Sequence, residues 1–211
     1  MKKLFIVLLC LVAVLAIISC KQDPKTEPTP APKMTDTDVL EGRACYRLTA
    51  TREAKRFALQ YYEADGSFNP VAGDTFSLKY RSPNRTVDRF YLRDSSEKKY
   101  LTEGSYHDIL ATDEPYITGP DDDGWYTLSF TFGTYADPMM GIRVELASYE
   151  HGKFVAGNYI EIKDVKFNDE LLTIEEDEET EAQQSNHGVW NASTTDSNKD
   201  HTLPTLEIVP L

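Results

Sequence analysis

The sequence has too few basic residues for a protein that binds nucleic acid through its phosphates. Its 211 residues include 22 Lys and Arg against 35 Asp and Glu, which gives a formal net charge of -13. Because nucleic acid requires a basic surface, we do not expect it as a partner. The same balance argues against adhesion to anionic lipid through basic side chains.

The motifs of common enzyme classes are also missing. The four histidines are scattered, and there is no His-Glu-x-x-His pair, Gly-x-Ser-x-Gly elbow or Walker loop. Carboxylates are abundant, but no spacing singles out a glycosidase pair. We therefore predict no enzymatic activity and keep an envelope hydrolase only as a third alternative.

Apolar runs are short, and the longest one lies at the N-terminus. Lys2 and Lys3 precede the uncharged run 4–18, which is shorter than the roughly 20 apolar residues of a transmembrane helix. This layout is typical of a signal peptide. The end of the run, Ile17-Ile18-Ser19-Cys20, resembles the lipobox of bacterial lipoproteins.

The lipobox resemblance implies that residues 1–19 are removed and that Cys20 carries a lipid anchor in the bilayer. Lys21 follows Cys20, and the absence of Asp there resembles outer-membrane sorting in enterobacterial lipoproteins. The implied location is the bacterial cell envelope, on the outer membrane. Cys10 lies in the removed segment, so Cys45 would have no partner for an intrachain disulfide. An ordinary signal peptide with an incidental cysteine is the alternative.

Three segments of different composition follow the apolar run. Residues 20–36 are rich in proline and poor in apolar side chains, which predicts an extended tether. Residues 37–174 contain many short runs of alternating polarity and are expected to form the folded domain. Residues 175–211 begin with an acidic run and are expected to be a mostly flexible tail, with a short strand at 205–209.

The clearest strand is predicted at residues 124–132. Its apolar side chains share one parity and its polar ones the other, with Trp125 on the polar side. Many runs of this kind predict an all-β fold, namely an antiparallel β-sandwich or jelly roll. In the run 159–167 the apolar parity changes at Lys163-Asp164, which predicts a β-bulge there.

Three strands carry a second resemblance. Residues 73–78, 124–130 and 159–167 resemble, in this order, strands of jelly-roll carbohydrate-binding modules, which belong to the galactose-binding-like sandwiches. The resemblance covers residues 39–170. It implies a jelly roll that binds an oligo- or polysaccharide without catalysis.

The same resemblance implies a structural calcium site. In that family the Asp before the closing Val often helps bind calcium, together with acids near the start of the domain. Asp164 matches this position, and Asp38 or Glu41 would be its partners. Lys163 departs from the family pattern, which has an acid or a small polar residue there. The alternative is a buried Asp164 whose carboxylate is satisfied by backbone amides.

Side chains of outward parity supply the candidate ligand contacts. Flat aromatic rings stack on sugar rings, and nearby polar groups bind the hydroxyls. Strands lying side by side would bring these candidates to one face: Tyr62, Tyr91, Arg93, Trp125, Arg143 and Tyr149. Because aromatic residues favour strands in any case, a structural or interaction lipoprotein is the alternative. It would bind another envelope or host protein and have no sugar site.

Overall fold

The computed structural model describes residues 33–62, 70–94, 109–110, 116–133, 141–175, 190–195 and 201–211. All of these except Lys33 belong to the compact unit Met34–Leu211. The described residues form two antiparallel β-sheets and a short helix, α2 (Asp36–Leu40), which precedes the first strand. The predicted signal peptide and nearly all of the predicted tether lie outside them.

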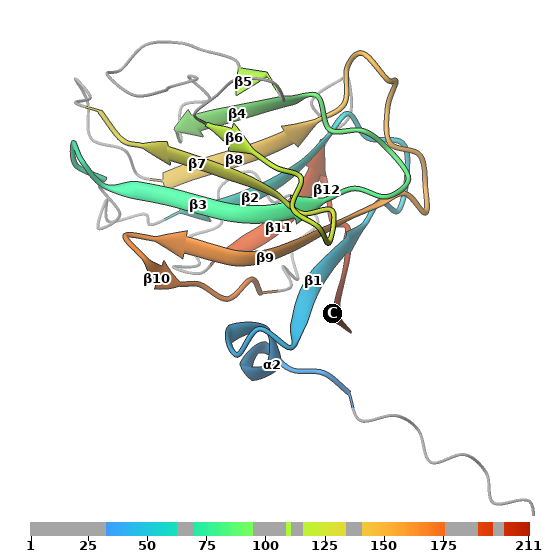
Figure 1. Cartoon of the computed structure of the whole chain (residues 1–211). Coiled ribbons are helices and arrows are strands. Elements are labelled where there is room, and N and C mark those ends of the chain that lie inside the picture. Colours follow the sequence, from blue (N-terminus) through green and yellow to red (C-terminus); the bar gives the residue numbers. More distant parts are fainter. Residues whose placement is uncertain are drawn as a thin grey trace, which may run out of the picture. The chain divides into compact units, whose positions relative to one another are not determined.

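The first sheet has seven strands and lies in front in Figure 1. Its order is β13 (Thr205–Pro210), β1 (Ala44–Thr49), β9 (Tyr159–Phe167), β3 (Thr75–Arg81), β7 (Tyr126–Thr131) and β6 (Ile117–Thr118), and β10 (Glu170–Leu171) pairs with β9.

The second sheet has six strands and lies behind the first (Figure 1). Its order is β12 (His201–Thr202), β11 (Asn191–Thr195), β2 (Arg56–Tyr62), β8 (Gly141–Ala147), β4 (Arg89–Asp94) and β5 (Ile109–Leu110).

The core lies between the two sheets. The ring centroids of Tyr80 on β3 and Phe90 on β4 are 5.1 Å apart, and those of Phe76 on β3 and Trp190, next to β11, are 5.3 Å apart. These pairs join side chains of different sheets, so the apolar parities of both sheets face one another. The predicted all-β, antiparallel architecture with two packed layers is therefore confirmed.

Strand β7 has the predicted orientation. Leu128, Phe130 and Phe132 are buried in the core, and Tyr126 is partly buried against it. Ser129 and Thr131, of the opposite parity, are exposed. Local alternation was sufficient to predict this strand, because one of its faces meets the core and most of the other faces solvent.

The predicted bulge in β9 is confirmed. Asp164 and Val165 together lie opposite Leu78 of β3, because Lys163 pairs with Lys79 and Lys166 with Ser77. Asp164 has a φ of 51°, which lies in the left-handed region that is costly for residues other than glycine. The extra residue turns Val165 into the core, where an unbroken alternation would have placed Asp164.

The C-terminal region differs from its prediction. The predicted strand at 205–209 is confirmed as β13, which pairs with β1. The predicted end of the domain at residue 174 is wrong, because Trp190 lies in the core with 6% of its surface exposed and β11 pairs with β2. Strand β11 was not predicted, because the acidic composition of the preceding run indicated a solvated tail. Residues 176–189 and 196–200 lie outside the described residues.

Where the structure describes the chain, it contains no helix with the length and apolar character needed to span a bilayer.

Candidate functional site

The candidate ligand contacts divide between the two sheets and do not form one face. Tyr91 on β4 and Arg143 on β8 lie on the outer face of the second sheet, and Tyr149 follows β8. Trp125 immediately precedes β7 in the first sheet. Tyr62 and Arg93 belong to strands of the second sheet, but their side chains lie outside the described part of the structure.

Trp125 is buried, although its parity predicted an outward ring. Only 2% of its surface is exposed. The guanidinium carbon of Arg81 lies 4.5 Å from its ring centroid, and Nζ of Lys163 lies 4.4 Å from it. Its backbone N–H donates to Oδ1 of Asp121 at 2.8 Å. Because the ring is almost fully buried, Trp125 does not offer a stacking surface to a sugar.

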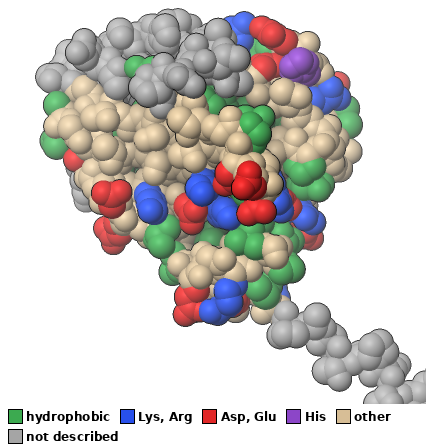
Figure 2. Space-filling model, in the orientation of Figure 1, with side chains coloured by type: hydrophobic (Ala, Val, Ile, Leu, Met, Phe, Trp, Pro, Cys, Tyr) green, Lys and Arg blue, Asp and Glu red, His purple; other side chains and the backbone are tan. Residues whose placement is uncertain are grey.

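Arg81 and Lys163 lie on β3 and β9 of the first sheet, and Figure 2 shows a band of charged side chains across the side of the molecule where that sheet lies. We call Arg47, Arg81, Glu161 and Lys163 the charged band. The strand register places Arg47, Glu161 and Arg81 side by side across β1, β9 and β3. Glu161 accepts hydrogen bonds from Arg47, with Nε at 3.0 Å, and from Arg81. Burial would raise the pKa of Glu161, but these two guanidinium groups outweigh it and hold that pKa below its usual range.

A buried polar cluster occupies the outer face of the second sheet. The register brings Glu145 of β8 beside Tyr91 of β4, and Arg143 of β8 beside Gln60 of β2. Oε2 of Glu145 lies 3.3 Å from Nη1 of Arg56, and Oε1 of the same carboxylate lies 3.3 Å from Nε of Arg143. We call this set the Glu145 cluster: Arg56, Gln60, Tyr91, Arg143 and Glu145.

The Glu145 cluster is unusual for an outward strand face because most of it is closed to solvent. Gln60, Tyr91, Arg143 and Glu145 are all buried. Burying charged groups costs several kcal/mol per ion, by order of magnitude, unless they are paired and hydrogen-bonded. The carboxylate of Glu145 lies between two guanidinium groups, so the buried charges are paired, and it fixes the positions of both arginines.

The cluster continues to Tyr149 at the end of the second sheet. Nε of Arg56 donates to the hydroxyl of Tyr149 at 3.0 Å, and the rings of Tyr91 and Tyr149 meet edge to face at 6.0 Å. The carboxylate of Asp88 accepts the backbone N–H groups of Tyr149 and Glu150. The turn after β8, and with it the start of Tyr149, is therefore held in place.

Arg56 links the buried and the accessible parts of this region. Its burial, the largest effect on its pKa, would lower that pKa, but the charges of Glu145 and Tyr149 and the hydrogen bond to Tyr149 raise it above the ordinary value. Arg56 and its neighbour Lys55 were missed by the sequence analysis. The available signal was the pair of adjacent basic residues at the start of an alternating run.

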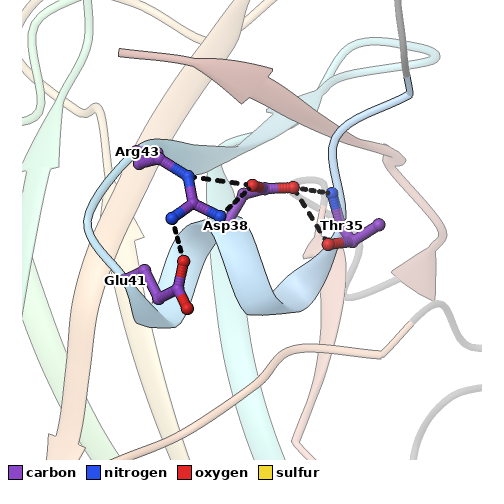
Figure 3. A network of polar contacts seen from close by, with 4 residues as sticks. All are labelled: Thr35, Asp38, Glu41 and Arg43. Carbon is purple, nitrogen blue, oxygen red and sulfur yellow. Dashed lines mark hydrogen bonds and ion pairs between the residues drawn. The ribbon is translucent and has the colours of Figure 1, made fainter.

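The predicted calcium ligands do not come together. Asp38 accepts hydrogen bonds from Arg43, with Nη2 at 2.6 Å, and from Thr35, while Glu41 forms an ion pair with the same arginine (Figure 3). Hydrogen bonds from Arg43, the largest effect, lower the pKa of Asp38. Within the described residues, no three Asp, Glu, His or Cys side chains are grouped so that they could hold a metal ion. Asp164 therefore does not join Asp38 and Glu41, and Arg43 supplies the positive charge that a cation would have supplied.

Comparison of the chain with protein-family models, with curated proteins and with solved structures finds no match in any of the three.

Proposed function

We propose that this chain is a lipid-anchored protein of the bacterial cell envelope. Its jelly-roll domain binds carbohydrate without catalysis, through the outer face of the second sheet. The lipid anchor is proposed from the lipobox resemblance at Cys20. The carbohydrate site is proposed from the Glu145 cluster and Tyr149.

The strand order supports the jelly roll. The first sheet contains the order β1-β9-β3-β7 and the second the order β2-β8-β4-β5. From β1 to β4 each successive strand changes sheet, and β8 and β9 do the same after β7. This alternation between the sheets is the strand connectivity of an eight-stranded jelly roll. In this interpretation β11 and β13 extend the two sheets beyond the eight strands.

The observation that supports carbohydrate binding best is the contact between Arg56 and Tyr149 at the accessible end of the Glu145 cluster. A sugar needs several donors and acceptors for its hydroxyls and one flat ring for its apolar face. Arg56 supplies donors and Tyr149 supplies a ring and a hydroxyl, while the buried Glu145 holds Arg56 in position. The accessible part of the site is the end near Tyr149, because Arg56 and Tyr149 are only partly buried. This moves the proposed contact from Trp125 to Tyr149.

A glycan array with the full-length chain in detergent tests the proposal. We expect binding that is weakened by Tyr149→Ala. Tyr159→Ala is the matched control, since Tyr159 also lies beneath a guanidinium group, that of Arg47 at 4.5 Å, but on the first sheet. Absence of binding to every glycan by folded protein would refute carbohydrate binding.

Lipid anchoring has a separate test. Cys20→Ala should abolish metabolic labelling with a fatty acid and release the protein from the membrane fraction. The matched control is Cys45→Ala, because Cys45 is buried in the first sheet. Equal labelling of the Cys20→Ala variant and the unchanged chain would contradict the anchor.

The alternative function is contact with another envelope or host protein, without a sugar site. It is favoured by the burial of Tyr91 and Arg143, which closes much of the second sheet's outer face to a glycan. The charged band on the first sheet would then be the contact surface. Capture of an envelope protein that is lost in an Arg81→Ala variant, together with a blank glycan array, would support this alternative.

A further inference from the structure

Three cations lie close to the ring of Tyr149. Nζ of Lys55 lies 5.4 Å from its centroid, and the guanidinium carbons of Arg56 and Arg89 lie 5.9 Å and 5.7 Å from it. Cations gathered close to one ring repel one another. The gathering is notable because the chain as a whole carries a net charge of -13.

The described acidic side chains nearby pair with Arg56 and Arg89 but form no ion pair with Lys55. Glu145 is buried between Arg56 and Arg143. Asp88 receives the backbone N–H groups that follow β8. Glu150 lies 3.7 Å from Nη2 of Arg89, but its side chain is 65% exposed, where water weakens the attraction. Within the described residues, Lys55 therefore carries a positive charge that no carboxylate pairs with, and it lies beside two arginines.

Two of the three cations retain donors for a ligand. Arg56 makes its contacts through Nε and Nη1, so the two hydrogens on Nη2 have no protein acceptor within the described residues. Lys55 contacts the ring of Tyr149 with its ammonium group and forms no ion pair in the part of the chain that the structure describes. An ammonium and a guanidinium bind oxyanions through strong, charge-assisted hydrogen bonds.

Ligand access is available on this side of the sheet. The side chains of Arg56 and Arg89 are 16% and 33% exposed, in contrast to the closed interior of the Glu145 cluster. A group bound here would meet fixed donors, because Glu145 and Tyr149 hold Arg56 in place. Such preorganisation lowers the cost of binding.

We propose that Lys55, Arg56 and Arg89 form an anion subsite around Tyr149, and that it binds a carboxylate or sulfate group of an acidic saccharide. This inference rests on the proposed carbohydrate binding and adds the class of ligand. The ring of Tyr149 would lie against the sugar that carries the anionic group. Neutral saccharides would lack the charge-assisted contacts and bind more weakly.

The test is calorimetric titration of the full-length chain in detergent with chondroitin sulfate, polygalacturonate and an uncharged β-glucan. We expect at least one acidic polysaccharide to bind about tenfold more tightly than the glucan, in line with hydrogen bonds to charged groups. Chondroitin sulfate carries both carboxylate and sulfate groups, so binding to it but not to polygalacturonate would show that sulfate is required. Binding to polygalacturonate would show that a carboxylate is sufficient. Binding should weaken as salt is raised.

Variants assign the binding to this subsite. Lys55→Gln and Arg89→Gln should each weaken binding of the acidic polysaccharide by about tenfold. Lys79→Gln should leave it unchanged, because Lys79 is a similarly exposed cation on the first sheet that pairs with Asp121 at 3.7 Å. Circular dichroism and the urea midpoint would confirm that each variant is folded.

Different failures overturn different claims. Equal affinity for acidic and uncharged glycans, or binding unaffected by Lys55→Gln and Arg89→Gln, would refute the anion subsite while carbohydrate binding stands. Binding to no polysaccharide and to no glycan on the array would refute both.

Discussion

Replacing Glu161 with Gln tests whether the charged band on the first sheet holds the sheet together. Glu161 is 2% exposed as a side chain and accepts hydrogen bonds from both Arg47 and Arg81. Gln keeps the size of the side chain but removes its charge. Two guanidinium groups would then face an amide that cannot neutralise them.

The expected loss follows from the burial of each partner. Removing one member of a fully buried ion pair costs about 3–5 kcal/mol, whereas an exposed pair contributes about 0–1 kcal/mol. The acid here is buried, but the side chains of Arg47 and Arg81 are 33% and 31% exposed. Water can therefore solvate the abandoned cations in part, and we expect a loss of about 2–3 kcal/mol in the free energy of unfolding at pH 7.

The effect should depend on pH with a defined sign. The pKa of Glu161 is lowered in the folded protein by Arg47 and Arg81, which outweigh burial. Its contribution is therefore fully present above the unfolded value of about 4.3 and is lost as the pH falls through the lower folded pKa. The stability difference between the unchanged chain and Glu161→Gln should be constant from pH 7 to about pH 5 and then shrink.

Urea unfolding followed by tryptophan fluorescence at several pH values measures this difference. Glu53→Gln is the matched control, because Glu53 forms an ion pair with Lys153 but its side chain is 58% exposed. The control should cost less than about 1 kcal/mol. The reasoning is refuted if Glu161→Gln unfolds at the same urea concentration as the unchanged chain at pH 7, or if the two substitutions cost the same.

Three further predictions concern single positions. Trp125→Ala should lower the free energy of unfolding by about 3–5 kcal/mol, as for other buried aromatics, and leave glycan binding intact under folding conditions. Loss of glycan binding without loss of stability in urea would show that Trp125 is a ligand contact after all. Burial, the largest effect, raises the pKa of Cys45 to about 11, so in a chain with no other cysteine a thiol reagent at pH 8 should react only after unfolding, and rapid labelling of the native protein would contradict its buried position. Asp164→Gly should be neutral or stabilise the fold by up to about 1 kcal/mol, and Asp164→Val should destabilise it, because the φ of 51° suits glycine and not a β-branched residue. If the Val variant were more stable than the Gly variant in urea unfolding, the bulge geometry would be refuted.

The sequence was sufficient for features that depend on neighbouring residues. Alternation predicted the core face of β7, and the change of parity at Asp164 predicted the bulge of β9. Each of these features is determined by a run of fewer than ten consecutive residues. The end of the domain was not predictable in this way, because Trp190 lies alone beyond an acidic run and its burial depends on Phe76 and Tyr61 from distant strands.

The parity of a residue along its strand also does not determine to which of the two sheets an outward side chain belongs. Trp125 and Tyr91 both have outward parity, yet one lies on each sheet. Nor does outward parity imply exposure, since Arg81 and Lys163 cover Trp125. The expected aromatic face failed for these two reasons, although each of the strands involved was correctly predicted.

The grouping of cations around Tyr149 could not be predicted from the sequence, because it depends on how the strands pair. Lys55 directly precedes β2, Arg56 begins β2, Arg89 begins β4, and Tyr149 follows β8. These positions meet because Arg56 and Arg89 both lie opposite Ala147, on either side of β8. Alanine leaves room above the sheet for two long basic side chains to converge on the ring that lies two residues further along. A larger residue at position 147 would push them apart, so the proposed subsite depends on that small side chain as much as on its cations.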